Sequence, residues 1–157
     1  MKKLYLFACI SSCCLALQSC KDEYTLCNLV KDVRFTGGFY RKVGSNDVVA
    51  PAQKFTLSEL NSGSNIYNQQ VNVEVFSLPL SQVIDSAKYV LKLDANLQAD
   101  TVTIKYTSQG VNLSLECGGV TYNTITSIST TINTLDSIKI VRALVNTEPV
   151  QNVKIYY

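Results

Sequence analysis

The stretch that decides the fold reads DTVTIKYTSQGVNLSLEC and covers residues 100–117. Apolar side chains occupy every second position from 102 to 106, and the alternation resumes over 111–117. A period of two places one set of side chains on the buried face of a half-exposed strand. Thr, Val, Ile and Tyr, which strands prefer, dominate the stretch. We therefore predict two strands here, with a turn at Gln109-Gly110 between them.

The same period recurs elsewhere in the chain, over residues 71–75, 138–140 and 153–157. Clusters of Gly, Asn, Asp and Ser, which are typical of turns, separate the runs. These clusters lie at 37–38, 44–47, 61–65, 109–110 and 118–119. Short strands at such spacing predict an all-β protein with an immunoglobulin-like antiparallel β-sandwich. A small closed β-barrel is the alternative.

The first 19 residues have the layout of a secretory signal peptide. Lys2 and Lys3 precede an apolar run from Leu4 to Leu17, which is shorter than the roughly 20 residues that cross a bilayer. The run ends in Leu17-Gln18-Ser19-Cys20, which resembles a bacterial lipobox. The resemblance implies cleavage after residue 19 and lipid on Cys20, whose thiolate suits alkylation. An ordinary cleaved signal peptide is the alternative.

Residues 20–25 then form the lipidated N-terminus and tether, and residues 26–157 form a single β-sandwich domain. Lys21-Asp22-Glu23 resembles the signal that sends Bacteroidota lipoproteins to the outer face of the outer membrane. A charged, solvated tether is the alternative. We expect an outer membrane lipoprotein held to the membrane by its N-terminal lipid, exposed at the cell surface rather than facing the periplasm.

Cys27 and Cys117 remain after three cysteines leave with the signal peptide and Cys20 carries lipid. One pair in an oxidising compartment predicts a disulfide, and a loop of this length makes it worth about 4 to 5 kcal/mol in the chain-entropy model. Cys117 keeps the phase of its own run, and Cys27 that of Leu29, Val33 and Phe35, with Lys31 the one exception. We therefore expect both to point inward and to bridge the two sheets. Two unpaired buried thiols are the alternative.

Several segments, in their order along the chain, resemble a family of small Bacteroidota lipoproteins known only as a domain of unknown function. Besides the lipobox and Cys27, the matching segments are FSLPL (76–80), DTVTIKY (100–106), CG (117–118), DSIKI (136–140) and VKIYY (153–157). The segment 36–70 lies outside the resemblance. The resemblance implies a β-sandwich lipoprotein and supplies no activity, ligand or site.

Composition argues against an enzyme. The chain has no His, which excludes Ser-His and Cys-His nucleophile pairs and His-based zinc sites. It contains no glycine-rich phosphate loop and no calcium loop. Lys2 and Lys3 leave with the signal peptide, so 12 of the 14 basic residues remain and balance the 12 acidic residues. We expect no catalytic residues, no cofactor, no metal and no nucleic-acid partner.

Asp followed by Ser or Thr and an apolar residue occurs three times, and it resembles the O-glycosylation acceptor of exported Bacteroidota proteins. The candidate acceptors are Ser86, Thr101 and Ser137. The alternative is that these pairs open strands from turns, where Asp and Ser are common. An intact mass of protein plus lipid alone excludes the modification.

Two functions from different classes remain. The first is a non-catalytic structural or protein-interaction module of the envelope, which contacts other proteins through a sheet edge or loop. The second is a surface module that binds glycan or peptide on exposed tyrosines. Tyr40, Tyr67, Tyr122 and Tyr156 lie outside the clearest core runs and are the candidates. Three exposed tyrosines around one concavity favour the second function, and dispersed tyrosines favour the first.

Overall fold

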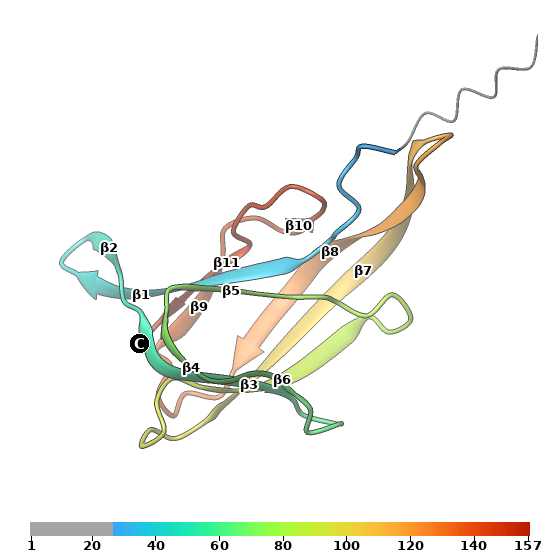
Figure 1. Ribbon diagram of the computed structural model, residues 1–157. Coiled ribbons are helices and arrows are strands. Elements are labelled where there is room, and N and C mark those ends of the chain that lie inside the picture. Colours follow the sequence, from blue (N-terminus) through green and yellow to red (C-terminus); the bar gives the residue numbers. More distant parts are fainter. Residues whose placement is uncertain (1–26) are drawn as a thin grey trace, which may run out of the picture.

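The computed structural model describes residues 27–157, which contain strands and no helix (Figure 1). Residues 27–157 contain no helix that is long and apolar enough to cross a membrane. The strands are β1 (Phe35–Val43), β2 (Asn46–Val49), β3 (Ala52–Glu59), β4 (Asn65–Val73), β5 (Val75–Leu78), β6 (Ser86–Lys92), β7 (Asp100–Ser114), β8 (Gly118–Thr130), β9 (Ser137–Ile140), β10 (Leu144–Val145) and β11 (Val153–Tyr156). The predicted signal peptide and tether, residues 1–25, lie outside the described residues.

The strands form two sheets that face each other, which confirms the predicted sandwich rather than the closed barrel. One sheet has the order β2-β1-β11-β9, with β5 also paired to β1. The other has the order β10-β8-β7-β6-β3-β4. Their pairs are antiparallel except for β1 and β11, which run parallel. The last strand therefore lies beside the first in the middle of one sheet.

Alternate residues of both sheets fill the space between them. Phe39, Val153 and Ile155 from one sheet and Phe55 and Ile104 from the other are each at most 1% exposed. The rings of Phe39 and Phe55 meet across the layers, with centroids 5.1 Å apart. The alternation expected over 102–106 and at Val153 and Ile155 is thus confirmed, because each of these strands turns one face to the opposite sheet.

Residues 71–75, predicted as one strand, belong to two. Of the three valines only Val73 is buried, whereas Val71 and Val75 are 64% and 54% exposed. β4 ends at Val73, and after Glu74 the chain enters the other sheet as β5. An alternation of apolar residues cannot reveal such a crossing, since the period is the same on both sides of it.

Two of the expected turns lie inside strands. Gly37 and Gly38 are buried within β1, and Gly110 lies within β7. A Cβ at Gly37 would lie 2.6 Å from two carbons of the Phe76 ring, so glycine here permits a close approach of backbone and ring. By contrast, Gly44, with φ of +62°, lies in the turn between β1 and β2, and Gly118, with φ of +68°, directly follows the β7–β8 turn as the first residue of β8.

Cys27 and Cys117 form the predicted disulfide, with Cα atoms 4.9 Å apart. It joins the two sheets as expected, but at their ends, and neither cysteine lies in a strand. Cys27 precedes β1, and Cys117 lies in the turn that joins β7 to β8. Beyond Tyr106, residues 107–110 are exposed and the β7–β8 hairpin extends past the core (Figure 1). The bridge therefore ties the segment before β1 to the tip of this hairpin.

Candidate binding groove

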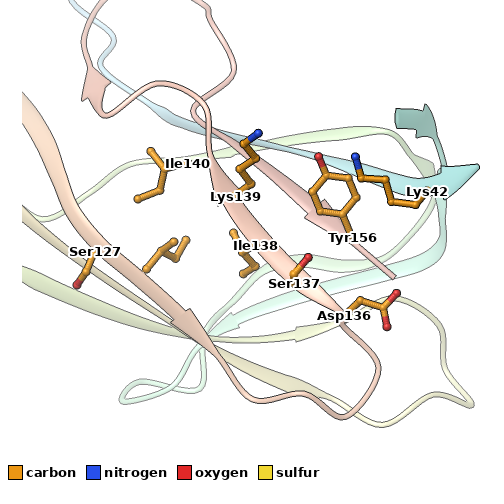
Figure 2. A pocket seen from close by; sticks show the side chains of 9 residues that line it. Lys42, Ser127, Asp136, Ser137, Ile138, Lys139, Ile140 and Tyr156 are labelled. Atoms are coloured by element: carbon orange, nitrogen blue, oxygen red, sulfur yellow. The ribbon is translucent and has the colours of Figure 1, made fainter. Parts of the chain in front are cut away.

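A groove of about 700 Å³ opens on the side of the sandwich where β8 and β9 approach each other (Figure 2). β8 belongs to the six-stranded sheet and β9 to the five-stranded one. The groove therefore lies between β8 of one sheet and β9, the edge strand of the other. Its lining residues are Lys42, Ser127, Ile128, Asp136, Ser137, Ile138, Lys139, Ile140 and Tyr156.

Strand β9 forms one wall of the groove and is an edge strand. It pairs with β11 on one side and, within residues 27–157, with no strand on the other. On the facing wall, β10 covers β8 only at Asn123 and Thr124. The following part of β8, from residue 126 onward, has no strand on that side in the described chain. Such edges present unpaired backbone N–H and C=O groups.

Apolar side chains line the groove between the two walls. Ile128 on β8 and Ile138 and Ile140 on β9 are half-buried and pack against the core. Polar side chains, among them Lys139 and Asp136, stand around them (Figure 2). An apolar floor with a polar rim is the usual composition of a protein–protein contact patch.

The longest of the other free edges in the described chain is irregular. β4 ends the six-stranded sheet, and its residues Gln69 and Asn72 have φ of 49° and 53°, in the left-handed region. The pairing of β3 with β4 also shifts register twice. Such irregularities disfavour the addition of a further strand. Within the described chain, β9 has no residue with positive φ.

A charged cluster centred on Asp47 borders the groove and joins three strands. Lys42 of β1 and Lys154 of β11 contact its two carboxylate oxygens at 2.5 and 2.8 Å, and the Tyr156 hydroxyl donates to one of them at 3.0 Å. Hydrogen bonds from Lys154 and Lys42 hold the pKa of Asp47 well below its usual range. Lys154 also lies 4.8 Å from the centre of the Tyr40 ring. Asp47 thus neutralises one of two neighbouring lysines.

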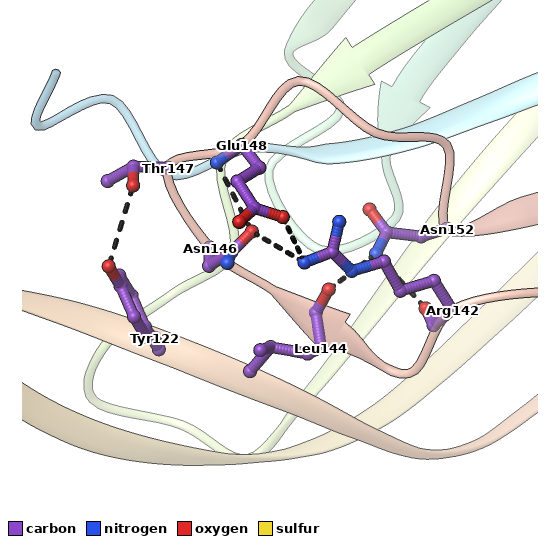
Figure 3. A network of polar contacts seen from close by, with 7 residues as sticks. All are labelled: Tyr122, Arg142, Leu144, Asn146, Thr147, Glu148 and Asn152. Carbon is purple, nitrogen blue, oxygen red and sulfur yellow. Dashed lines mark hydrogen bonds and ion pairs between the residues drawn. The ribbon is translucent and has the colours of Figure 1, made fainter.

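A polar network fixes the chain between β9 and β11 (Figure 3). The buried Asn152 side chain donates to the carbonyls of Arg142 and Leu144 at 3.1 and 3.0 Å and accepts from the Thr36 N–H at 3.0 Å. Arg142 pairs with Glu148, and its hydrogen bond lowers the pKa of that carboxyl. These contacts hold Leu144 where β10 pairs with β8, so the covered part of the β8 edge ends there.

Asp100 fixes the loop that leads from β8 to β9. Its carboxylate is 1% exposed and accepts hydrogen bonds from the Thr131 hydroxyl and the backbone N–H groups of Asn133, Thr134 and Leu135, at 2.8 to 3.0 Å. Burial raises the pKa of Asp100, but the three N–H groups and the hydroxyl outweigh it and leave the pKa below its ordinary value. The loop places β9 at the groove.

The candidate modification sites lie apart. Cys20 lies outside the described residues. Ser86 opens β6 and Thr101 follows the buried Asp100 in β7; both are half-buried. Ser137 is exposed at the start of β9, beside the groove. The structure brings none of these three together, and Ser137 is the most accessible to a transferase.

The four candidate tyrosines do not form an exposed cluster. Tyr156 is buried at 6% exposure, because Lys42 and Asp47 cover a ring that faces outward. Tyr67 packs against Phe55 and bonds the backbone of Ser77. Tyr40 and Tyr122 are half-buried on different sheets. Tyr40 and Tyr156 are neighbours, with ring centres 6.2 Å apart, whereas Tyr67 and Tyr122 contact other residues, so the four do not gather around one concavity.

Sequence reasoning singled out Ser137 and Tyr156, which line the groove, for other roles, and it missed the residues that position the groove. Asp47 and Lys154 are 107 residues apart, and Asp100 meets a loop more than thirty residues away, so no local pattern joins them. A usable signal was the Asp100-Thr101 pair, because Asp at a strand start commonly accepts backbone hydrogen bonds.

Comparison with known proteins gives a family and no activity. A family model described as "Family of unknown function (DUF6452)" matches residues 54–157. The match includes residues 54–70, which the resemblance noted from the sequence left out. No curated protein and no solved structure matches the chain.

Proposed function

Since the chain belongs to the DUF6452 family of unknown function, we propose its function from the groove: a non-catalytic, lipid-anchored envelope module binds an extended segment of another envelope protein along β9. The observation that carries the proposal is a regular, unpaired strand edge that opens on an apolar groove. Strand addition uses both features, since the edge supplies backbone hydrogen bonds and the groove takes alternate side chains.

The dimensions of the site suit one added strand. Ile138 and Ile140 are two residues apart on β9, so their side chains lie on the same face of the strand. Alternate side chains of an added strand would meet them on that face. Ile128 on the facing wall lines the same groove. The specificity of such a site comes from these few apolar positions, and its affinity from the backbone ladder.

The carboxylates support a non-catalytic role. Asp47, Asp100 and Glu148 are engaged by lysines, backbone N–H groups and Arg142 respectively. In the described part of the chain no three of His, Cys, Asp and Glu gather as metal ligands do. The chain also lacks His, the commonest general base at neutral pH.

The lipid anchor and the envelope location rest on the N-terminal sequence. The Leu17-Gln18-Ser19-Cys20 segment supports lipid on Cys20, and Lys21-Asp22-Glu23 supports export to the outer face of the outer membrane. The Cys27–Cys117 disulfide fits an oxidising compartment. We propose that the domain displays its groove on the cell surface.

An array of peptides from the exported proteins of the source cell tests the groove. The lipidated protein in detergent is titrated with each bound peptide. It is also titrated with two derivatives of that peptide, one N-methylated at the odd residues and the other at the even residues. Ile140→Lys places a charge in the groove, and Ile66→Lys, on the irregular β4 edge, is the matched control. We expect Ile140→Lys to raise Kd at least about tenfold, equivalent to about 1.4 kcal/mol, and Ile66→Lys to leave it unchanged.

N-methylation should abolish binding in one of the two alternating patterns, because it removes the N–H groups that reach β9. Thermal unfolding of both variants checks that they are folded. Equal losses from the two lysine substitutions, or tight binding of both N-methylated forms, would show that β9 is not the binding edge.

A further inference from the structure

The end of the molecule at the β7–β8 hairpin tip carries the two most exposed leucines of the described chain. Leu115, in the turn, is 101% exposed, and Leu29, two residues after Cys27, is 52% exposed. The disulfide between Cys27 and Cys117 holds these two segments together. Figure 1 shows the described chain entering beside this tip, at the far end of the long hairpin. A single exposed leucine needs no explanation, but apolar side chains that gather at one tip mark a contact surface.

The length of chain between the proposed anchor and the disulfide limits where this tip can be. Cys27 lies seven positions after Cys20, so an extended tether spans at most about 25 Å. Without the disulfide the first residue fixed in a sheet is Phe35, fifteen positions after Cys20, and the reach doubles to about 50 Å. The bridge therefore fastens the short tether directly to the leucine-bearing tip.

We propose that the hairpin tip is a membrane-contact surface: Leu115 and Leu29 enter the interfacial region of the bilayer that holds the acyl chains of Cys20. The inference rests on the proposed lipid anchor, which supplies the proximity. Apolar side chains at a lipid interface add their burial to that of an acyl chain. The charged Lys31, Asp32 and Glu116 are exposed nearby, where they stay in the hydrated headgroup layer.

This contact also orients the groove. Ser127 lies nine positions along β8 from Gly118 at the tip, which is about 30 Å of strand. A domain standing on its hairpin tip therefore holds the β9 edge away from the lipid surface. The groove then faces proteins rather than the membrane.

A single tryptophan reports the contact, because the chain contains none. Leu115→Trp places it at the tip. The matched control is Leu97→Trp, an exposed leucine in the connection between β6 and β7, at the opposite end of β7. Both full-length proteins are produced with lipid and reconstituted into vesicles of phosphatidylethanolamine and phosphatidylglycerol, with and without bromine on the acyl chains.

We expect brominated lipid to quench Leu115→Trp fluorescence by at least about half and to shift its emission to the blue, with Leu97→Trp unaffected, since indole prefers the bilayer interface. Vesicle flotation and intact mass are measured on the same samples. Floating, acylated protein without quenching at position 115, or with equal quenching at both positions, overturns the tip contact and leaves the anchor intact. Protein that neither floats nor carries acyl groups overturns the anchor and the tip contact together.

Discussion

Asp100 shows how one side chain positions the groove. Its two carboxylate oxygens accept four hydrogen bonds from residues 131–135, the loop before β9. Asp100→Asn keeps the shape but replaces one acceptor oxygen with a donor, so buried N–H groups lose their partner. We predict a loss of about 2 kcal/mol in the free energy of unfolding, measured by urea denaturation. Asp85→Asn, at an exposed position, is the control and should change it by less than about 0.5 kcal/mol.

The same carboxylate gives the stability a pH dependence of known sign. The folded state lowers the pKa of Asp100, so its contribution is complete above the unfolded pKa of about 3.9 and falls as pH drops through the folded pKa. We predict that the stability difference between wild type and Asp100→Asn is constant from neutral pH to about pH 5 and narrows below about pH 4. A difference that widens in acid would contradict the ionised acceptor.

Gly37 and Gly38 are adjacent in β1 but differ in what a side chain meets. A Cβ at Gly37 would contact the Phe76 ring, which is 3% exposed and packed against Phe39 and Phe55. At Gly38 it would meet the side-chain amide of Gln151, the end of a flexible side chain. We predict that Gly37→Ala costs about 2 kcal/mol and Gly38→Ala less than half of that. Chemical denaturation of both variants measures the difference, and equal costs would contradict a rigid contact at Phe76.

At the scale of elements, alternation in the sequence predicts a strand where one face is buried and the other is solvated. It succeeds for residues 102–106, which cross the core. It fails over 111–117, where Leu115 is fully exposed, because the hairpin has passed the end of the opposite sheet and has no core to face. Gly37-Gly38 misled for a related reason: a close approach to a ring and a turn both favour glycine.

The groove was beyond prediction from the sequence because it depends on strand order. β9 is an edge only because β11 returns to pair with β1, and nothing in the local sequence of either strand indicates that parallel pairing. The disulfide was predictable because Cys27 and Cys117 are the two cysteines left once the proposed signal peptide and the proposed lipidated Cys20 are set aside. Its location at a hairpin tip was not, because phase alone does not show where a strand ends.

The disulfide holds the part of the β7–β8 hairpin that extends past the core. Residues 107–110 of the β7–β8 hairpin are exposed, and the bridge links its tip to a segment 90 residues away in the chain. Replacing both Cys27 and Cys117 with Ser should lower the free energy of unfolding by about 2 to 4 kcal/mol. Hydrogen exchange should also accelerate at the tip before it does at residues 102–106. Unchanged stability and exchange would show that the hairpin is held by its backbone ladder alone.

At the scale of the whole molecule, the disulfide-linked tip and the groove lie at different points along the β7–β8 hairpin. The chain enters at the hairpin tip, the disulfide fastens it there, and the groove lies farther along β8. In the proposed arrangement the lipid on Cys20 holds the tip at the membrane and the β9 edge stands clear for an extended partner. The exposed Ser137 beside the groove remains the best placed of the three candidate glycosylation acceptors, and a sugar there would stand at the rim of the binding site.

The arrangement depends on lipid at Cys20, and one measurement tests it most directly: the intact mass of the protein extracted from the membranes of its own cell, followed by fragmentation of its N-terminus. We predict a chain that begins at Cys20, with a diacylglycerol on its sulfur, an acyl group on its amine and the Cys27–Cys117 bridge intact. Any mass beyond that would be located at Ser86, Thr101 or Ser137. A chain that begins elsewhere, or that begins at Cys20 without fatty acyl groups, would contradict the account.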